Sequence, residues 1–261
     1  MPGSTPTMHP PHHLHWWTDI HRSAAVNIRL GMTLSFIAGA TNAGGFLAIG
    51  HYTSHMTGLL SSVADHLVLG QFGLVMASLA AIAAFVGGAM TTAMMVNWGM
   101  RRQLRSAFAR PLALETGLLL VFGLFGAVIH LHAELFAPLT VLLLCYIMGL
   151  QNAVITKISN AEIRTTHVTG LVTDIGIELG KMAYVNRSPL PSRVQANRRK
   201  LRIHLALVGA FFTGGVLGAL GFKLWGYVTT VPLALLLGLL VSGPLLHDIR
   251  SGRLAPAAGQ D

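Results

Sequence analysis

Two similar polar segments carry the residue types that could do chemistry in this sequence. The first reads Thr53-Ser54-His55-Met56-Thr57-Gly58-Leu59, and the second reads Thr165-Thr166-His167-Val168-Thr169-Gly170-Leu171, 112 residues later. We call residues 53–59 and 165–171 the first and second cassettes. Histidine titrates near neutral pH and can relay protons or bind metals. The equivalent residues His55, Thr57, Gly58, His167, Thr169 and Gly170 are therefore the first candidate site.

Each cassette also has a purely structural interpretation. A threonine hydroxyl can cap the N-terminus of a short helix, and a histidine can anchor the chain at lipid headgroups. If the Thr-x-Gly turns begin short helices inside the protein, their free N–H groups and positive dipole ends favour anions or carboxylate groups. The sequence leaves these interpretations open.

Three carboxylates are candidates for coupling a movement to a proton or a cation. Asp174 and Glu178 stand four residues apart, on one face of a helix, and Lys181 follows three residues later. Such a trio is also typical of a solvated face at a membrane boundary. Glu115 lies three residues into an apolar segment, so we expect it at the cytoplasmic interface beside Arg110. A buried coupling carboxylate is the alternative.

Histidines offer a weaker case for a metal site. His51 and His55 have the i, i+4 spacing that could place two imidazoles on one ion if the stretch is helical. Gly50 argues against a continuous helix there. A histidine-rich tract lies in the N-terminal tail, at His9, His12, His13 and His15. A disordered tail with Trp16 and Trp17 at the interface is the competing interpretation. We expect no resident metal and no cofactor.

The sequence lacks the motifs that would indicate an enzyme. It has no HExxH, no GxSxG and no phosphate-binding glycine loop. Its one cysteine, Cys145, lies inside an apolar run, which excludes disulfides and cysteine-based zinc sites. Two equivalent sites also fit poorly with a single active centre. We expect that the chain is not an enzyme.

The elements that must position these residues are membrane helices. Of the 261 residues, 52% are apolar and 10% are charged, far below the roughly 25% charged of an ordinary soluble domain. Uncharged runs exceed the roughly 20 apolar residues that cross ~30 Å of hydrocarbon. The composition predicts an all-α, polytopic membrane protein.

Six segments are apolar on all sides and long enough to span a bilayer. They are residues 30–50, 72–96, 112–129, 135–155, 203–222 and 227–246. Two less apolar segments, 51–70 and 165–181, contain the cassettes and are left out of the spanning set. Counting the second as a span would place Asp174 and Glu178 in a crossing helix, at about 2.5–3.5 kcal/mol for each acid near its centre.

The distribution of basic residues sets the orientation. With the N-terminus inside, all of the 18 Lys and Arg residues except Lys223 lie on the cytoplasmic side, as the positive-inside rule predicts. We expect both termini in the cytoplasm and the chain in a bacterial cytoplasmic (inner) membrane. Topology thus explains the formal net charge of +9, and no nucleic-acid partner is expected.

The chain contains an internal repeat. Asn42-Ala43 in the first span matches Asn152-Ala153 in the fourth at an offset of 110, and the cassettes match at 112. The segment Phe85-Val86-Gly87-Gly88 matches Phe212-Thr213-Gly214-Gly215 at 127. The unit of span, cassette, span, span therefore occurs in residues 30–134 and again in 135–246, where the copy includes a basic loop at 182–202. Residues 1–29 and 247–261 form tails.

Three crossings per copy is an odd number, so the second copy enters the membrane from the opposite side. The first cassette then faces outside and the second faces inside. An inverted repeat with a broken, polar segment in each half indicates a midplane site in transporters. We expect six transmembrane helices in two inverted three-helix repeats, each with a broken or re-entrant polar segment. Interfacial amphipathic loops are the alternative.

The chain resembles the YoaK family of bacterial membrane proteins, whose function is uncharacterised. The resemblance rests on the Gly39-Ala40-x-Asn42 end of the first span, the His55-Met56-Thr57-Gly58 segment and the run from Arg164 to Gly170. The first cassette of that family usually ends Thr-Gly-Asn, where this chain has Leu59. The resemblance implies a membrane location and this architecture, and it supplies neither a substrate nor catalytic residues.

These observations favour a small-solute transporter or channel. Its central path would be lined by the two cassettes together with Asn42 and Asn152. A non-transporting scaffold or a pH or ligand sensor is the first alternative, and a membrane-embedded enzyme is the weakest. The expected partners are the lipid bilayer and an unknown small solute, and the sequence leaves a homo-oligomer open.

Overall fold

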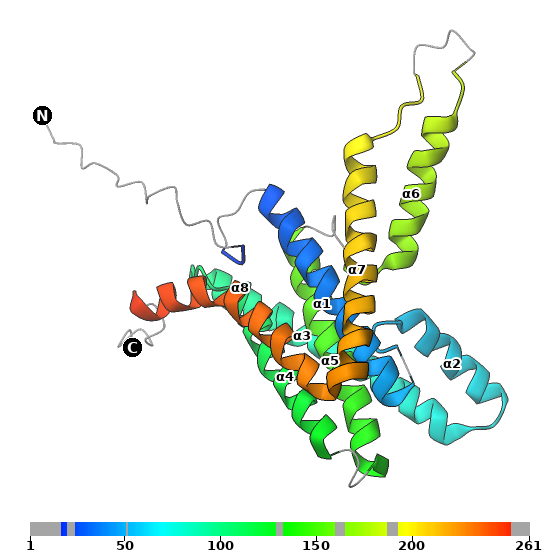
Figure 1. The fold of residues 1–261 in the computed structure, drawn as a ribbon, viewed down its shortest axis with the longest axis vertical. Helices are drawn as coiled ribbons and strands as arrows, with labels where there is room; N and C mark the ends of the chain where they lie inside the picture. Colours follow the sequence, from blue (N-terminus) through cyan, green and yellow to red (C-terminus); the bar gives the residue numbers. More distant parts are fainter. Residues whose placement is uncertain are drawn as a thin grey trace, which may run out of the picture.

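The computed structural model describes residues 17–19, 24–50, 52–128, 133–159, 165–186 and 193–251. Within these residues all regular elements are helices (Figure 1). They are α1 (Ala24–Ile49), α2 (Met56–Val68), α3 (Phe72–Arg101), α4 (Ala109–Val128), α5 (Ala133–Ile158), α6 (Val168–Ala183), α7 (Arg198–Trp225), the 3-10 turn η1 (Gly226–Thr229) and α8 (Thr230–Arg250). The predicted all-α class is confirmed for the described chain.

Six long helices correspond to the six expected spans. The helices α1, α3, α4, α5, α7 and α8 each contain most of one span, and their ends differ from the expected ends by a few residues. The two segments left out of the spanning set form the shorter helices α2 and α6. By length and composition, three stretches of the described chain could cross a membrane: Phe72–Arg101, Phe136–Ile158 and Arg198–Arg250.

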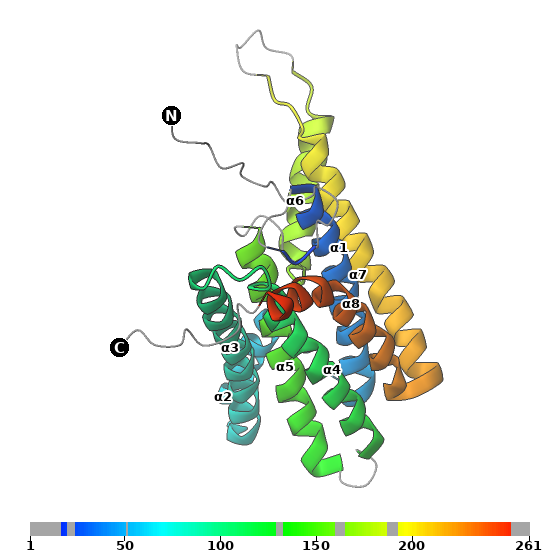
Figure 2. The same cartoon turned by 90° about the vertical axis from the view of Figure 1, so that its left-hand side faces the viewer.

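The third of these stretches contains two helices and a turn. Its 53 residues are more than twice the roughly 20 that one crossing requires. Gly226 has a φ of 60°, in the left-handed region that glycine enters without a steric penalty. The chain turns at this residue, so α8 leads back from the end of α7 toward α4 (Figures 1 and 2).

α1 and α7 pack against each other in the same direction, backbone against backbone. A side chain at Gly39 would overlap the carbonyl oxygen of Phe211, and one at Gly218 would overlap the backbone of Ala40. Small residues allow such close approach between helices in a membrane. The glycines of this pair are therefore used for packing inside the chain.

α3 and α5 form the equivalent contact, again between a helix of one repeat and a helix of the other. A side chain at Gly149 would overlap the carbonyl oxygen of Phe85, and one at Gly88 would overlap that of Tyr146. The hydroxyl of Thr92 donates a hydrogen bond of 3.0 Å to the carbonyl of Leu150. Gly88 contacts Tyr146, and Thr92, four residues later, contacts Leu150, also four residues later. α3 and α5 therefore also run in the same direction.

α4 and α8 run in opposite directions. A Cβ at Gly123 would overlap the hydroxyl of Thr230, whereas one at Gly238 would lie 3.8 Å from Cγ2 of Thr116. The partner numbers therefore rise on one helix as they fall on the other. α4 and α8 are the last helices of their respective repeats.

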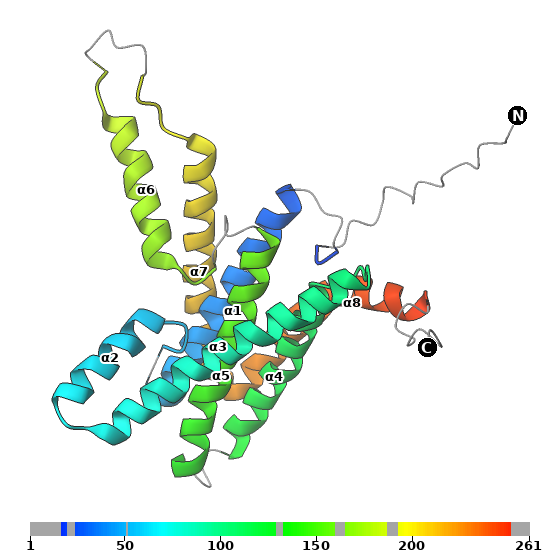
Figure 3. The ribbon, with the colours of Figure 1, turned by 180° about the vertical axis from the view of Figure 1, so that it is seen from behind.

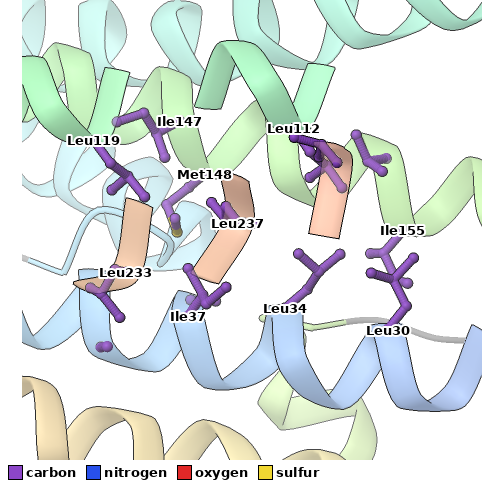
Figure 4. Close-up of a cluster of buried hydrophobic side chains, with 14 of the residues drawn as sticks. Leu30, Leu34, Ile37, Leu112, Leu119, Ile147, Met148, Ile155, Leu233 and Leu237 are labelled. Atoms are coloured by element: carbon purple, nitrogen blue, oxygen red, sulfur yellow. The ribbon is translucent and has the colours of Figure 1, made fainter. Parts of the chain in front are cut away.

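The centre of the bundle is filled by aliphatic side chains from α1, α4, α5 and α8 (Figure 4). Leu30 of α1 lies opposite Ile155 of α5, and Ile37 lies opposite Met148. These four side chains have no exposed surface. α1 and α5, the first helices of their repeats, therefore also run in opposite directions.

The outer faces of several long helices are apolar and exposed. Phe212 and Leu224 of α7 are 67% and 66% exposed, and Leu239 of α8 is 74% exposed. A soluble monomer rarely leaves apolar surface of this extent uncovered. These faces have the character of surfaces that lipid tails cover.

Polar contacts tie together three parts of the chain at one end of the bundle. Asp19 forms an ion pair of 3.0 Å with Nε of Arg105. The carboxylate of Asp248 accepts hydrogen bonds from the backbone N–H of Arg105 (3.3 Å) and of Ser106 (2.8 Å). The described N-terminal residues, the α3–α4 connection and the end of α8 therefore lie on the same side.

Candidate functional site

Asn42 fastens the first cassette to α1. Its Oδ1 accepts hydrogen bonds from the backbone N–H of Ser54 (3.3 Å) and from the Ser54 hydroxyl (3.1 Å). α1 continues for seven residues beyond Asn42, to Ile49, which is about 10 Å at 1.5 Å per residue. The chain therefore folds back along the last two turns of α1 before α2 begins.

Asn152 does the same for the second cassette. Its Oδ1 accepts hydrogen bonds from the hydroxyls of Thr166 (2.6 Å) and Thr165 (3.4 Å). Its Nδ2 donates to the carbonyl of Met148 at 2.8 Å. Asn152 also lies six residues before the end of its helix, at Ile158. The two asparagines matched by the internal repeat thus hold the two cassettes in equivalent ways.

Both cassettes reach α1, but at different levels. The hydroxyl of Ser35 donates a buried hydrogen bond of 3.1 Å to the carbonyl of Thr165, whereas Ser54 binds Asn42. Ser35 and Asn42 are seven residues apart, which corresponds to about 10 Å along the helix axis. The structure therefore brings the cassettes to the same helix without joining them in one site.

The remaining cassette candidates face outward from the chain. His55, Thr57, His167, Thr169 and Gly170 are exposed, and Gly58 is half-buried. The imidazole of His55 covers Gly58, where any side chain would overlap the ring. At Gly170 a Cβ would have no neighbour within 4 Å. A path lined by these residues stays a prediction, and the two cassettes differ at their glycines.

The threonines do not cap the cassette helices. α2 and α6 begin directly after His55 and His167, and neither helix has a side-chain hydrogen bond at its N-cap. Thr57 and Thr169 are the second residues of these helices, two positions after the N-cap. Each helix then runs outward beside the long helix that follows it, α2 beside α3 and α6 beside α7 (Figure 3).

Asp174 and Glu178 attach α6 to the beginning of α7. Glu178 is buried, and its carboxylate accepts hydrogen bonds from Nζ of Lys181 (2.8 Å) and from the backbone N–H of Asn197 (2.6 Å). The Lys181 ammonium and then the Asn197 amide hold the pKa of Glu178 below its ordinary value. Asp174 pairs with Nζ of Lys200 at 3.1 Å. A coupling role for either acid stays a prediction, since both are engaged as helix anchors.

Glu115 was expected at the cytoplasmic interface beside Arg110, but its side chain is enclosed between α4 and α5. It is fully buried, and its Oε1 accepts a hydrogen bond of 3.0 Å from Nε2 of Gln151 on α5. Arg110 turns elsewhere, with its guanidinium 4.6 Å from the ring centroid of Trp98. The connection between α3 and α4 holds Arg110 in this orientation, because the hydroxyl of Ser106 accepts a hydrogen bond of 3.2 Å from Nε of Arg110. The buried alternative describes the position of Glu115.

Gln151 is a residue that the sequence analysis missed. It directly precedes Asn152 and faces α4, whereas Asn152 faces the second cassette. Adjacent residues of a helix point about 100° apart, so one pair can serve two neighbours. The signal in the sequence was the position of Gln151 inside an apolar span, because a buried amide there needs a hydrogen-bond partner.

Close glycine contacts also correct the alignment of the two halves. Gly39 and Gly149 are 110 residues apart, and their closest backbone neighbours, Phe211 and Phe85, are 126 apart. The sequence match aligned residues 85–88 of α3 with residues 212–215 of α7 at an offset of 127. The alignment of identical residues in α3 and α7 therefore differs by one residue from the alignment of their packing faces, because packing depends on which residue faces the partner helix.

Within the described chain, no group of three or more His, Cys, Asp and Glu side chains is placed to hold a metal ion. The histidines that raised this question fall largely outside the described residues: His9, His12, His13, His15 and His51. His55, the intended partner of His51, precedes α2 and covers Gly58. The expectation that the protein holds no metal or cofactor stays a prediction.

A shallow hollow lies on the surface near the C-terminal end of α3, the end that the distribution of basic residues predicts to be cytoplasmic. It is lined by Met94, Met95, Trp98 and Arg110. The guanidiniums of Arg102 and Arg110 each lie 4.6 Å from the Trp98 ring centroid, within the range of cation–π attraction. Tryptophan and arginine together are typical of a membrane–water interface.

Comparison with known proteins points to one family. A family model described as "Protein of unknown function (DUF1275)" matches residues 30–242. The chain is 25% identical over 229 residues to "UPF0700 transmembrane protein YoaK" of Bacillus subtilis (strain 168), an alignment that covers 85% of this chain and 96% of that protein. No solved structure matches the chain.

Proposed function

The chain is a membrane protein of the DUF1275 family, and from this premise we propose that it transports a small solute by moving two inverted halves. In this proposal six helices cross a bacterial cytoplasmic membrane and both termini lie in the cytoplasm. The bilayer and the solute are the partners. We assign no reaction, no cofactor and no nucleic-acid partner to the chain.

The antiparallel pairing of equivalent helices carries this proposal. α1 lies antiparallel to α5 and α4 lies antiparallel to α8, and each pair joins the same element of the two repeats. The contact of α1 with α7 is likewise the counterpart of the contact of α5 with α3. A two-fold axis perpendicular to the helices would exchange the two halves. This relation supports opposite orientations of the halves in the bilayer. Many secondary transporters have this arrangement.

The folded-back cassettes support a solute site in each half. Each returns along about two turns of helix before it leads outward again, and an asparagine side chain accepts its hydrogen bonds. Non-helical backbone is tolerated at membrane depth only where protein or water satisfies it. We therefore propose that the first cassette contacts solute from outside and the second from the cytoplasm.

The filled centre favours a carrier over an open channel. Leu30, Ile37, Met148 and Leu237 are fully buried where α1, α4, α5 and α8 meet (Figure 4). Passage between the cassettes requires these contacts to rearrange, because packed interiors switch between discrete arrangements and do not deform continuously. The described conformation is then a closed one.

Flux into liposomes tests the proposal. The purified full chain would be reconstituted and offered labelled amino acids, sugars and carboxylates, with saturable uptake of one class as the expected result. The double variant Thr57→Val with Thr169→Val should reduce that uptake to the level of empty liposomes, because it removes one exposed hydroxyl at the equivalent position of each cassette. The matched control is Thr33→Val with Thr213→Val, one residue in each half, whose hydroxyls bond to carbonyls of their own helices outside the cassettes.

Two outcomes would count against the proposal. Normal uptake by the folded cassette variant would show that these residues do not contact the solute. No saturable uptake of any class by the folded wild type would favour the alternative of a scaffold or a pH sensor. The exposure of His55 and His167 is the observation that favours a sensor, since both imidazoles can be reached from outside the chain.

A further inference from the structure

Glu115 is a buried carboxylate that the transport proposal does not use. It lies six residues after the start of α4, about 9 Å along the helix, and it has no exposed surface. Leu112 and Leu119 share its helix face, by their i, i−3 and i, i+4 spacing, and both are fully buried. The carboxyl group is therefore held in apolar surroundings.

Glu115 and Gln151 leave two complementary oxygens without partners. Nε2 of Gln151 donates to Oε1 of Glu115 at 3.0 Å. Oε2 of Glu115 and Oε1 of Gln151 are buried and accept no hydrogen bond. Two acceptors cannot bond to each other, so an ionised Glu115 leaves both atoms unsatisfied.

The charged groups of the surrounding elements are engaged elsewhere or exposed. Among the side chains that the structure describes, they are Arg29 of α1, Arg101 of α3, Arg110 of α4, Lys157 of α5, and His247, Asp248 and Arg250 of α8. Arg250 is exposed, and His247 contacts Asp248. Arg29 and Arg101 are exposed, Lys157 donates to Asn97 at 3.0 Å, and Arg110 covers Trp98. Among the ion pairs of the described chain, none includes Glu115.

We propose that Glu115 and Gln151 form a proton-binding site, and that Glu115 carries the proton in this conformation. A proton from water forms an O–H bond at Oε2, and that O–H donates to Oε1 of Gln151. The pair then makes two hydrogen bonds, its charge changes from −1 to 0, and no buried acceptor is left without a donor. A lone buried carboxylate would instead cost many kcal/mol of lost hydration.

The position of Gln151 gives this site a connection to the second cassette. Gln151 and Asn152 are consecutive on α5, and Asn152 holds Thr165 and Thr166. A movement of α5 that releases the cassette would also break the acid–amide pair and expose Glu115 to water, where it ionises. Proton occupancy and cassette position are thus linked, whether or not the chain transports a solute.

Infrared spectroscopy of the full chain in lipid nanodiscs tests the site directly. The wild type at neutral pH should show the carbonyl stretch of a hydrogen-bonded carboxylic acid, and Glu115→Gln should lack it. Asp65→Asn is the matched control, because Asp65 is an exposed carboxylate on α2 and its substitution should leave the band unchanged. Because protonation is measured and not flux, failure of this inference is distinguishable from failure of the transport proposal.

A second variant keeps the test decisive if Glu115→Gln does not fold. Gln151→Leu removes the amide partner, so the carboxylic acid band should move to the frequency of a free acid. Absence of a carboxylic acid band from the wild type at neutral pH would overturn the proposal. A band that neither substitution changes would also overturn it, because the proton would then belong to another group.

Discussion

At the scale of single residues, buried amides do much of the positioning in this protein. Asn42 and Asn152 each face a returning segment of chain, and Gln151 faces Glu115. An amide offers donors and acceptors without a charge, so it can satisfy polar groups in an apolar interior at little electrostatic cost. The two asparagines were predicted as path residues, which stays a prediction, and their hydrogen bonds show that each supports a cassette.

Replacing these asparagines should loosen the cassettes. Asn42→Ala removes the acceptor for the Ser54 N–H and hydroxyl, and we expect a loss of about 1–3 kcal/mol in the free energy of unfolding. Asn152→Ala should have a similar effect, measured by thermal unfolding in detergent. Asn97→Ala is the control, because its partner Lys157 forms an exposed contact. Equal melting temperatures for all three variants would contradict the supporting role.

Acidification should detach α6 from α7. Hydrogen bonds from Lys181 and Asn197 lower the pKa of Glu178, so this tie is present above the ordinary glutamate value of about 4.3 and is lost as pH falls through the lower folded value. We expect pepsin to cleave the α6–α7 connection several-fold faster once the pH drops through that range.

Glu178→Gln should reproduce this effect at neutral pH, where trypsin can be used. Asp65→Asn removes a charge from exposed α2 and serves as the control. Cleavage of Glu178→Gln at the wild-type rate would show that the carboxylate does not anchor α6.

At the scale of elements, glycine contacts define which helices belong together. Gly39 and Gly149 occupy matching positions in the repeat and each meets the backbone of a helix from the other copy. Gly88 and Gly214 make further backbone contacts of this kind. The sequence could not predict the partner helices, because a small residue suits any close neighbour.

Adding one methyl group at these glycines should separate the helices. Gly39→Ala and Gly149→Ala would overlap carbonyl oxygens of Phe211 and Phe85, and we expect each to cost about 1–3 kcal/mol through overpacking. Gly209→Ala is the matched control, because its Cβ would meet no atom within 4 Å. Thermal unfolding would measure the difference, and an equal effect of all three would contradict the assigned helix pairs.

At the scale of the whole molecule, hydrophobicity determined what could be predicted. The six long helices follow from apolar length, and the shorter α2 and α6 follow from the polar residues that interrupt it. The burial of Glu115 did not follow from the sequence, because it depends on Gln151 arriving from another helix. The exposure of His55 and His167 was one of the interpretations that the sequence left open, because a repeat shows which residues are equivalent but not where their side chains point.

Sided labelling of two single cysteines tests the inverted arrangement most directly. In a Cys145→Ala background, Asp65→Cys reports the α2 side of the first half, and Arg193→Cys reports the α6–α7 connection of the second. Both positions are exposed. A membrane-impermeant thiol reagent should label Asp65→Cys only in right-side-out vesicles and Arg193→Cys only in inverted ones. Labelling of both positions from the same face would contradict the inverted halves on which the transport proposal rests.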